Sequence, residues 1–155
     1  VFPIPEPKLT TFARLVGLNG DAKMSKSLNN TILLSDSPEE IQKRMKTAVT
    51  DPQKLRRNDP GRPEVCLVYT YHKKFNPNEV QQIETDCRSG ALGCVACKTN
   101  CATKISDSLA SFREKRSYYE NHLSEVKEIL HDGEMKARKV AQQTMNEVRE
   151  AMKIG

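Results

Sequence analysis

Five consecutive residues near the beginning of the chain have the types and spacing needed to handle a polyphosphate. They are Lys23, Met24, Ser25, Lys26 and Ser27. Two ammonium groups three residues apart, with two hydroxyls beside them, can converge on phosphate oxygens and stabilise charge on a departing pyrophosphate. Gly20 before this segment and Asn29-Asn30 after it favour turns, so the lysines can move as a lid does. An ordinary solvated loop is the alternative interpretation.

Four cysteines form a second group that could do chemistry. Cys66, Cys87, Cys94 and Cys97 are separated by 20, 6 and 2 residues. Four soft ligands suit a zinc ion or an iron–sulfur cluster, and the spacing does not separate these two. A disulfide and simple burial of small apolar side chains are the competing interpretations. For Cys101, one helical turn beyond Cys97, we favour burial.

Positive charge is concentrated in one stretch of a chain whose net charge is +5. Residues 41–62 contain seven basic and two acidic side chains, a local excess of five. Such a segment is typical of a surface that contacts a nucleic-acid backbone, and a solvated face is the alternative. No apolar run approaches the ~18 residues that a membrane-spanning helix needs.

Helices are expected to position these groups. Ser37 as N-cap, Pro38 at the first helical position and Glu40 predict a helix over 37–49. Further helices are expected over 64–75, over 76–87 with Asn76 as cap, from 94 onward, over 123–130 and over 134–153, with a break at 132–133. A short strand is expected at 31–34. The histidines, His72 among them, are expected to be capping or surface groups.

Several motifs carry a resemblance that reaches beyond the first segment. They are Asn58-Asp59-Pro60-Gly61, Tyr71-His72-Lys73, Cys87-Arg88-Ser89-Gly90, Gly93 to Lys98, and Lys136-Ala137-Arg138. In this order, after Lys23 to Ser27, they resemble the bacterial tryptophanyl-tRNA synthetases, which are class I aminoacyl-tRNA synthetases, over almost the whole chain. The family's His-Ile-Gly-His type signature and its tryptophan pocket do not occur in this sequence. We therefore expect the C-terminal half of a longer enzyme, inactive alone.

The resemblance implies ATP-dependent activation of tryptophan and its transfer to tRNA(Trp), with Mg²⁺ accompanying ATP. Lys26, assisted by Lys23, would be catalytic, and Met24, Ser25 and Ser27 would complete the site for ATP and pyrophosphate. Some members hold a four-iron cluster through a similar cysteine pattern. That implies a [4Fe–4S] cluster, with Zn²⁺ as the alternative, on Cys66, Cys87, Cys94 and Cys97. Contacts to tRNA are expected from Arg56, Arg57, Arg88 and Lys98.

The expected fold class is mainly α, a helical bundle preceded by a short extended segment. By resemblance, residues 1–36 are the tail of a Rossmann-like catalytic domain, and 37–155 form the anticodon-binding domain, whose last helix packs back on the catalytic domain. The enzyme would be a cytoplasmic homodimer without a membrane or DNA partner.

Three alternative functions remain. The chain could belong to a tyrosyl-tRNA synthetase, although the Gly-Cys-x-x-Cys-Lys element argues against this. It could also be a non-catalytic tRNA-binding module held together by a metal, or a structural fragment with neither activity nor affinity.

Overall fold

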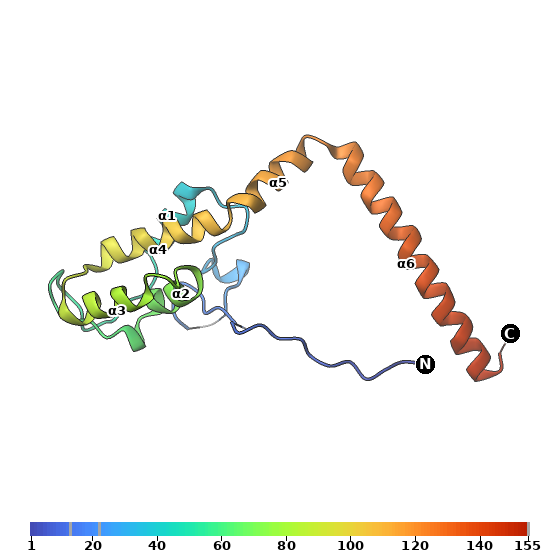
Figure 1. Ribbon diagram of the computed structural model, residues 1–155, viewed down its shortest axis with the longest axis horizontal. Coiled ribbons are helices and arrows are strands. Elements are labelled where there is room, and N and C mark those ends of the chain that lie inside the picture. Colours follow the sequence, from blue (N-terminus) through green and yellow to red (C-terminus); the bar gives the residue numbers. More distant parts are fainter. Residues whose placement is uncertain (13, 22, 155) are drawn as a thin grey trace. The chain divides into compact units, whose positions relative to one another are not determined.

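The computed structural model describes residues 1–12, 14–21 and 23–154, and it is mainly helical (Figure 1). Its elements are the 3₁₀ helices η1 (Lys26–Leu28) and η2 (Pro63–Val65) and the α-helices α1 (Pro38–Lys46), α2 (Leu67–Phe75), α3 (Val80–Ser89), α4 (Cys94–Ser108), α5 (Ala110–Glu120) and α6 (Leu123–Met152). Pairing of extended chain in these ranges is limited to one isolated antiparallel bridge between Val16 and Lys23. The predicted fold class is confirmed.

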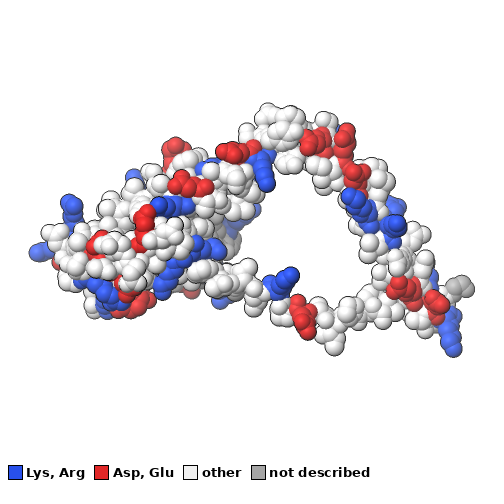
Figure 2. Space-filling view, viewed as in Figure 1, with Lys and Arg blue, Asp and Glu red and all other residues white. Residues whose placement is uncertain are grey.

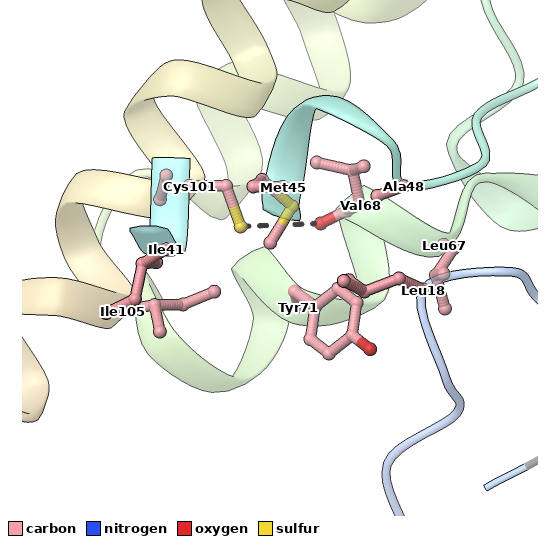
Figure 3. Packing of buried hydrophobic residues seen from close by; sticks show 10 residues of the cluster. Leu18, Ile41, Met45, Ala48, Leu67, Val68, Tyr71, Cys101 and Ile105 are labelled. Atoms are coloured by element: carbon pink, nitrogen blue, oxygen red, sulfur yellow. Dashed lines mark hydrogen bonds between the residues drawn. The ribbon is translucent and has the colours of Figure 1, made fainter. Parts of the chain in front are cut away.

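The chain divides into two compact units. One unit runs from Leu9 to Arg113, and the other combines Val1–Lys8 with Glu114–Gly155. In the first unit, α1 and α2 both pack on α4, and α3 packs on α2. Figure 3 shows how α1, α2 and α4 bury one apolar cluster, to which α1 contributes Ile41 and Met45, and α4 contributes Cys101. Cys101 is fully buried, which confirms the interpretation of this thiol as a core residue.

The segment before α1 is a turn, so the prediction of a strand at 31–34 is wrong. Asp36 accepts a hydrogen bond from the Leu33 backbone N–H at 2.8 Å, and the Asp36 N–H donates to the Leu33 carbonyl at 3.1 Å. The Asp36 side chain thus accepts the Leu33 N–H hydrogen bond that a neighbouring strand would have accepted in a sheet. The predicted cap of α1 is confirmed, because the Ser37 hydroxyl accepts from the Glu40 N–H at 3.2 Å.

Two of the helix starts differ from the predictions. The helix expected over 64–75 begins at Leu67, after the 3₁₀ turn η2. The next helix begins at Val80 and is preceded by a turn, in which the Glu79 N–H donates to the Asn76 carbonyl at 3.2 Å. The Asn76 side chain does not cap this helix, because its amide is engaged by His72 and Glu79 instead.

Helix α6 is one uninterrupted helix of 30 residues, drawn in orange and red in Figure 1. The predicted break at 132–133 is therefore wrong. A glycine inside a helix costs only about 1 kcal/mol relative to alanine, which a long amphipathic helix can offset. No helix in the part of the chain that the structure describes is long and apolar enough to cross a bilayer.

Candidate functional site

The Lys23–Ser27 segment is a short loop closed by its own hydrogen bonds. The Ser25 N–H donates to the Asn30 side-chain oxygen at 2.8 Å, and the Ser25 and Ser27 hydroxyls lie 2.9 Å apart. The 3₁₀ turn η1 begins within this segment, at Lys26, and Asn29 ends it in the left-handed region with φ of 49°. Asparagine tolerates this conformation better than most residues do. Lys23 and Lys26 are both exposed.

Asn30 fixes the base of this loop. It is 3% exposed, its carbonyl accepts from the Leu18 N–H at 2.8 Å, and its side-chain amide donates to Asn19 at 2.9 Å. A Cβ atom added to Gly17 would lie 2.0 Å from the Asn30 amide nitrogen, so this approach requires glycine. The Met24 N–H donates to the Leu15 carbonyl at 3.2 Å. Hydrogen bonds thus hold the base of the loop, while its two lysines are exposed to solvent.

The four cysteines predicted as ligands lie around one small cavity of about 20 Å³. Its wall includes Cys66 just before α2, Cys87 in α3, and Cys94 and Cys97 in the first turn of α4. All four thiols are reduced in the structure and half-buried. The helix packing thus brings together side chains that are up to 31 residues apart in sequence.

Burial and mutual proximity disfavour the charged form of two of these thiols. Desolvation, followed by the neighbouring thiols, raises the pKa of Cys97 to about 12. Desolvation raises the pKa of Cys87 as well, and Cys66 adds to that effect. Without a cation these groups are therefore neutral thiols, and a bound cation would have to supply the driving force for their ionisation.

The backbone is shaped around the Cys87 sulfur. A Cβ atom at Gly61 would lie 2.6 Å from Cys87 Sγ, so only glycine fits there. The Gly61 N–H donates to the Cys87 carbonyl at 2.8 Å. Lys54 also lines the cavity, and its ammonium donates to the Asp59 carbonyl.

No set of three or more His, Cys, Asp or Glu side chains within residues 1–12, 14–21 and 23–154 is arranged to hold one metal ion. The predicted metal centre is therefore not shown as a formed site. The structure shows a convergence of four thiols around a common space.

His72 was expected at a cap or on the surface, and this prediction is wrong. The side chain is fully buried in α2. Its Nε2 lies 3.2 Å from the Cys97 carbonyl oxygen and 3.4 Å from Cys97 Sγ, and its Nδ1 lies 3.3 Å from the Asn76 amide nitrogen. Burial lowers the pKa of His72, so the ring is neutral near pH 7. The periodicity of 64–75 offered a signal, because it places residue 72 one turn from the buried positions 68 and 69.

The basic segment divides into residues that stabilise the fold and residues that face solvent. Arg44 pairs with Asp36 at 3.1 Å, and Arg62 pairs with Asp51 at 2.6 Å. Arg56 and Arg57 are exposed and line a cavity of about 500 Å³, which the first turn of α4 also borders. Figure 2 shows that basic and acidic side chains alternate over the visible face of the helical body, so the basic character is local.

Arg88 and Lys98, the other predicted tRNA contacts, are both engaged within the fold. Arg88 pairs with Glu84 at 2.9 Å and Glu64 at 3.1 Å. The Lys98 ammonium donates to the Lys46 carbonyl at 2.9 Å. The large cavity is lined by neither residue.

The chain is similar to known proteins over most of its length. The sequence profile of tRNA synthetases class I (W and Y) matches residues 2–110. The chain is 44% identical over 156 aligned residues to a tryptophan–tRNA ligase of Aquifex aeolicus, covering 99% of this chain and 39% of that protein. It is 37% identical to the Thermotoga maritima tryptophan–tRNA ligase, covering 99% of this chain and 47% of that protein.

A solved structure of a tryptophanyl-tRNA synthetase from Campylobacter jejuni superposes with a TM-score of 0.78 at 31% identity, covering 92% of this chain and 45% of that one. The chain thus spans less than half the length of these relatives. The profile match extends over most of the sequence and includes both the Lys23–Ser27 loop and the cysteine-lined cavity. The chain belongs to the class I tRNA synthetases of the tryptophan and tyrosine (W and Y) type.

Proposed function

We propose that this chain is the C-terminal part of a tryptophan–tRNA ligase and carries that enzyme's pyrophosphate-handling loop and its tRNA-binding helices. The observation that carries the proposal is the Lys23–Ser27 loop, which is held at its base by Asn30 in a chain of this family. The relatives named tryptophan–tRNA ligase, aligned over nearly the whole chain, support tryptophan as the amino acid.

The first step of the proposed reaction joins tryptophan to ATP. A tryptophan carboxylate oxygen attacks the α-phosphorus, the bond to the bridging oxygen of the β-phosphate breaks, and pyrophosphate leaves. Bound Mg²⁺ would share in neutralising the charge of the phosphates. Negative charge therefore grows on the departing group. Lys26, assisted by Lys23, would stabilise that charge, while Ser25 and Ser27 would donate hydrogen bonds and Met24 would seat the loop.

The second step transfers the tryptophanyl group to tRNA(Trp). A hydroxyl of the terminal ribose attacks the activated carbonyl carbon, and AMP leaves. The helical part would bind the tRNA, with Arg56 and Arg57 on phosphates at the rim of the large cavity and Arg88 and Lys98 as further contacts. In this proposal residues 1–36 complete the catalytic domain and 37–155 form the anticodon-binding domain. The enzyme would work in the cytoplasm as a homodimer.

Amino-acid-dependent exchange between ATP and pyrophosphate tests the proposal. The full-length enzyme that carries this chain is expected to exchange with tryptophan and not with tyrosine. Exchange with tyrosine alone would establish the sister enzyme instead. The isolated chain should show no exchange but should retard tRNA in a gel, more weakly as salt rises, because phosphate contacts release counterions. Binding that is indifferent to salt would contradict the tRNA-binding assignment.

We further propose that Cys66, Cys87, Cys94 and Cys97 hold a [4Fe–4S] cluster. Support comes from the donor set, since these four thiols line one cavity. When bound, the cluster would hold α2, α3 and α4 together. With four cysteine ligands it would have no free coordination position for catalysis. Iron and sulfide analysis of anaerobically purified protein tests this. C94S is expected to lose iron, whereas C101A, a substitution in the core, is expected to keep it. Bound zinc in place of iron and sulfide would contradict the cluster.

A further inference from the structure

We propose that His72 is a positioning residue that donates a hydrogen bond from its Nε2–H to the sulfur of Cys97 and thereby sets the electronic properties of the metal centre. This inference rests on the cluster proposed above. The two atoms are 3.4 Å apart, and they belong to different helices, α2 and α4. His72 is fully buried, so the sulfur does not compete with bulk water for this donor.

The neighbours of the ring determine which nitrogen carries the proton. The Cys97 carbonyl oxygen lies 3.2 Å from Nε2 and can only accept, so Nε2 must be the donor. On the other side of the ring, the Asn76 amide nitrogen lies 3.3 Å from Nδ1. An amide NH₂ donates to Nδ1 only when Nδ1 carries a lone pair. Both contacts therefore select the same tautomer, with the proton on Nε2.

The orientation of the Asn76 amide is itself fixed. Its nitrogen also donates to Glu79 Oε2 at 3.0 Å, and an ionised carboxylate cannot donate in return. Glu79 is held in place by two groups of α4, since Asn100 donates to it at 2.8 Å and Lys104 pairs with it at 2.7 Å. A relay of hydrogen bonds thus runs from α4 through Glu79, Asn76 and His72 back to Cys97 in the same helix.

The Nε2 proton is shared between a carbonyl oxygen and a sulfur. A neutral thiol accepts weakly, whereas a thiolate bound to iron is a stronger acceptor, so metal binding shifts the sharing toward the sulfur. Hydrogen bonds to cluster sulfurs stabilise the more negative, reduced state and raise the reduction potential. Groups of this kind orient ligands without binding the metal themselves.

The experiment compares the wild-type chain with three variants after anaerobic reconstitution with ferrous iron and sulfide. H72F removes the donor and keeps a ring, while H72Q keeps an N–H donor at a similar distance from the backbone. Y71F is the matched control, because Tyr71 is the next residue of the same helix and loses a buried hydrogen bond to the Val16 carbonyl. Iron and sulfide content, the visible absorption spectrum and the midpoint potential are measured for each.

We expect H72F to bind iron with a midpoint potential more negative than that of the wild type, and H72Q and Y71F to resemble the wild type. An unchanged potential in H72F, or an equal shift in H72Q or Y71F, would overturn the role of His72 while leaving the cluster intact. Absence of iron and sulfide from the wild-type protein would overturn the cluster and the inference together. If H72F alone fails to bind iron, the variant N76A provides the test. N76A removes the hydrogen bond to His72 Nδ1 and should give a smaller negative shift of the midpoint potential. No shift in N76A would then overturn the relay.

Discussion

Asp51 and Arg62 hold together the two ends of the loop over residues 51–62. The Asp51 carboxylate accepts from the Arg62 backbone N–H at 2.8 Å, from its Nε at 3.1 Å and from its Nη2 at 2.6 Å. This charge-assisted, bidentate arrangement is among the stronger hydrogen-bond geometries available to a protein. Arg56 and Arg57 lie within the loop that it closes.

D51N should therefore loosen the loop that carries the two arginines. An asparagine amide places a donor against the guanidinium and cannot reproduce the paired acceptors. We expect limited trypsin digestion to cleave after Arg56 and Arg57 several-fold faster in D51N than in the wild type. D132N, on α6, provides the control and should leave the cleavage rate unchanged. Equal rates in D51N and the wild type would show that the pair does not hold the loop.

Asn30 should hold the Lys23–Ser27 loop in its observed conformation. Removing its side chain leaves the Ser25 N–H and the Asn19 oxygen without their partner, which typically costs about 1–3 kcal/mol. N30A is expected to lower the free energy of unfolding by that amount in urea titrations. S27A alters an exposed residue of the same loop and should change it by less than about 0.5 kcal/mol. An unchanged free energy of unfolding in N30A would mean that the loop is held by other contacts.

Glu79 should make the free energy of unfolding depend on pH in the acidic range. Hydrogen bonds from Asn100, Asn76 and Lys104 lower the pKa of Glu79 from 4.5 to about 2. The stabilisation is therefore fully present above the unfolded-state value and is lost as pH falls from about 4.5 towards 2. E79Q should show a shallower fall of the unfolding free energy across this window, and E128Q, on α6, should not. Identical slopes for E79Q and the wild type would exclude this linkage.

Arg56 and Arg57 should contribute to tRNA binding mainly through phosphate contacts. For the double variant R56A/R57A we expect weaker binding and a slope of log affinity against log salt that is smaller by about one for each arginine lost. R88A is the comparison, because the Arg88 guanidinium is already paired with Glu84 and Glu64 and should contribute less. An unchanged salt dependence in the double variant would place the tRNA elsewhere on the protein.

Local signals predicted those parts of the fold that local interactions determine. The Ser37 cap, the helix from Cys94 and the burial of Cys101 follow from capping residues and helical periodicity, and the structure confirms them. The start of α3 was misplaced because Asn76 is a good capping residue whose side chain is instead used by a tertiary contact with His72. Capping preference does not reveal such competition.

The remaining errors have separate causes. A strand at 31–34 was predicted from apolar residues, but the Asp36 side chain redirects the Leu33 N–H. The break at Gly133 was predicted from glycine alone, whereas α6 continues through it. The four thiols could be grouped by their spacing, yet the buried donor beside Cys97 could not, because His72 is 25 residues away and meets it only when α2 packs on α4.

In the proposed function, the Lys23–Ser27 loop stabilises the pyrophosphate leaving group when tryptophan is activated. The most direct measurement is tryptophan-dependent ATP–pyrophosphate exchange by the full-length enzyme carrying K26A, with S27A as a milder change in the same loop. We expect K26A to slow exchange by ~10²-fold or more, with tryptophan binding much less affected, because the lost interaction acts on charge that develops in the transition state. Exchange at the wild-type rate in K26A would contradict the claim.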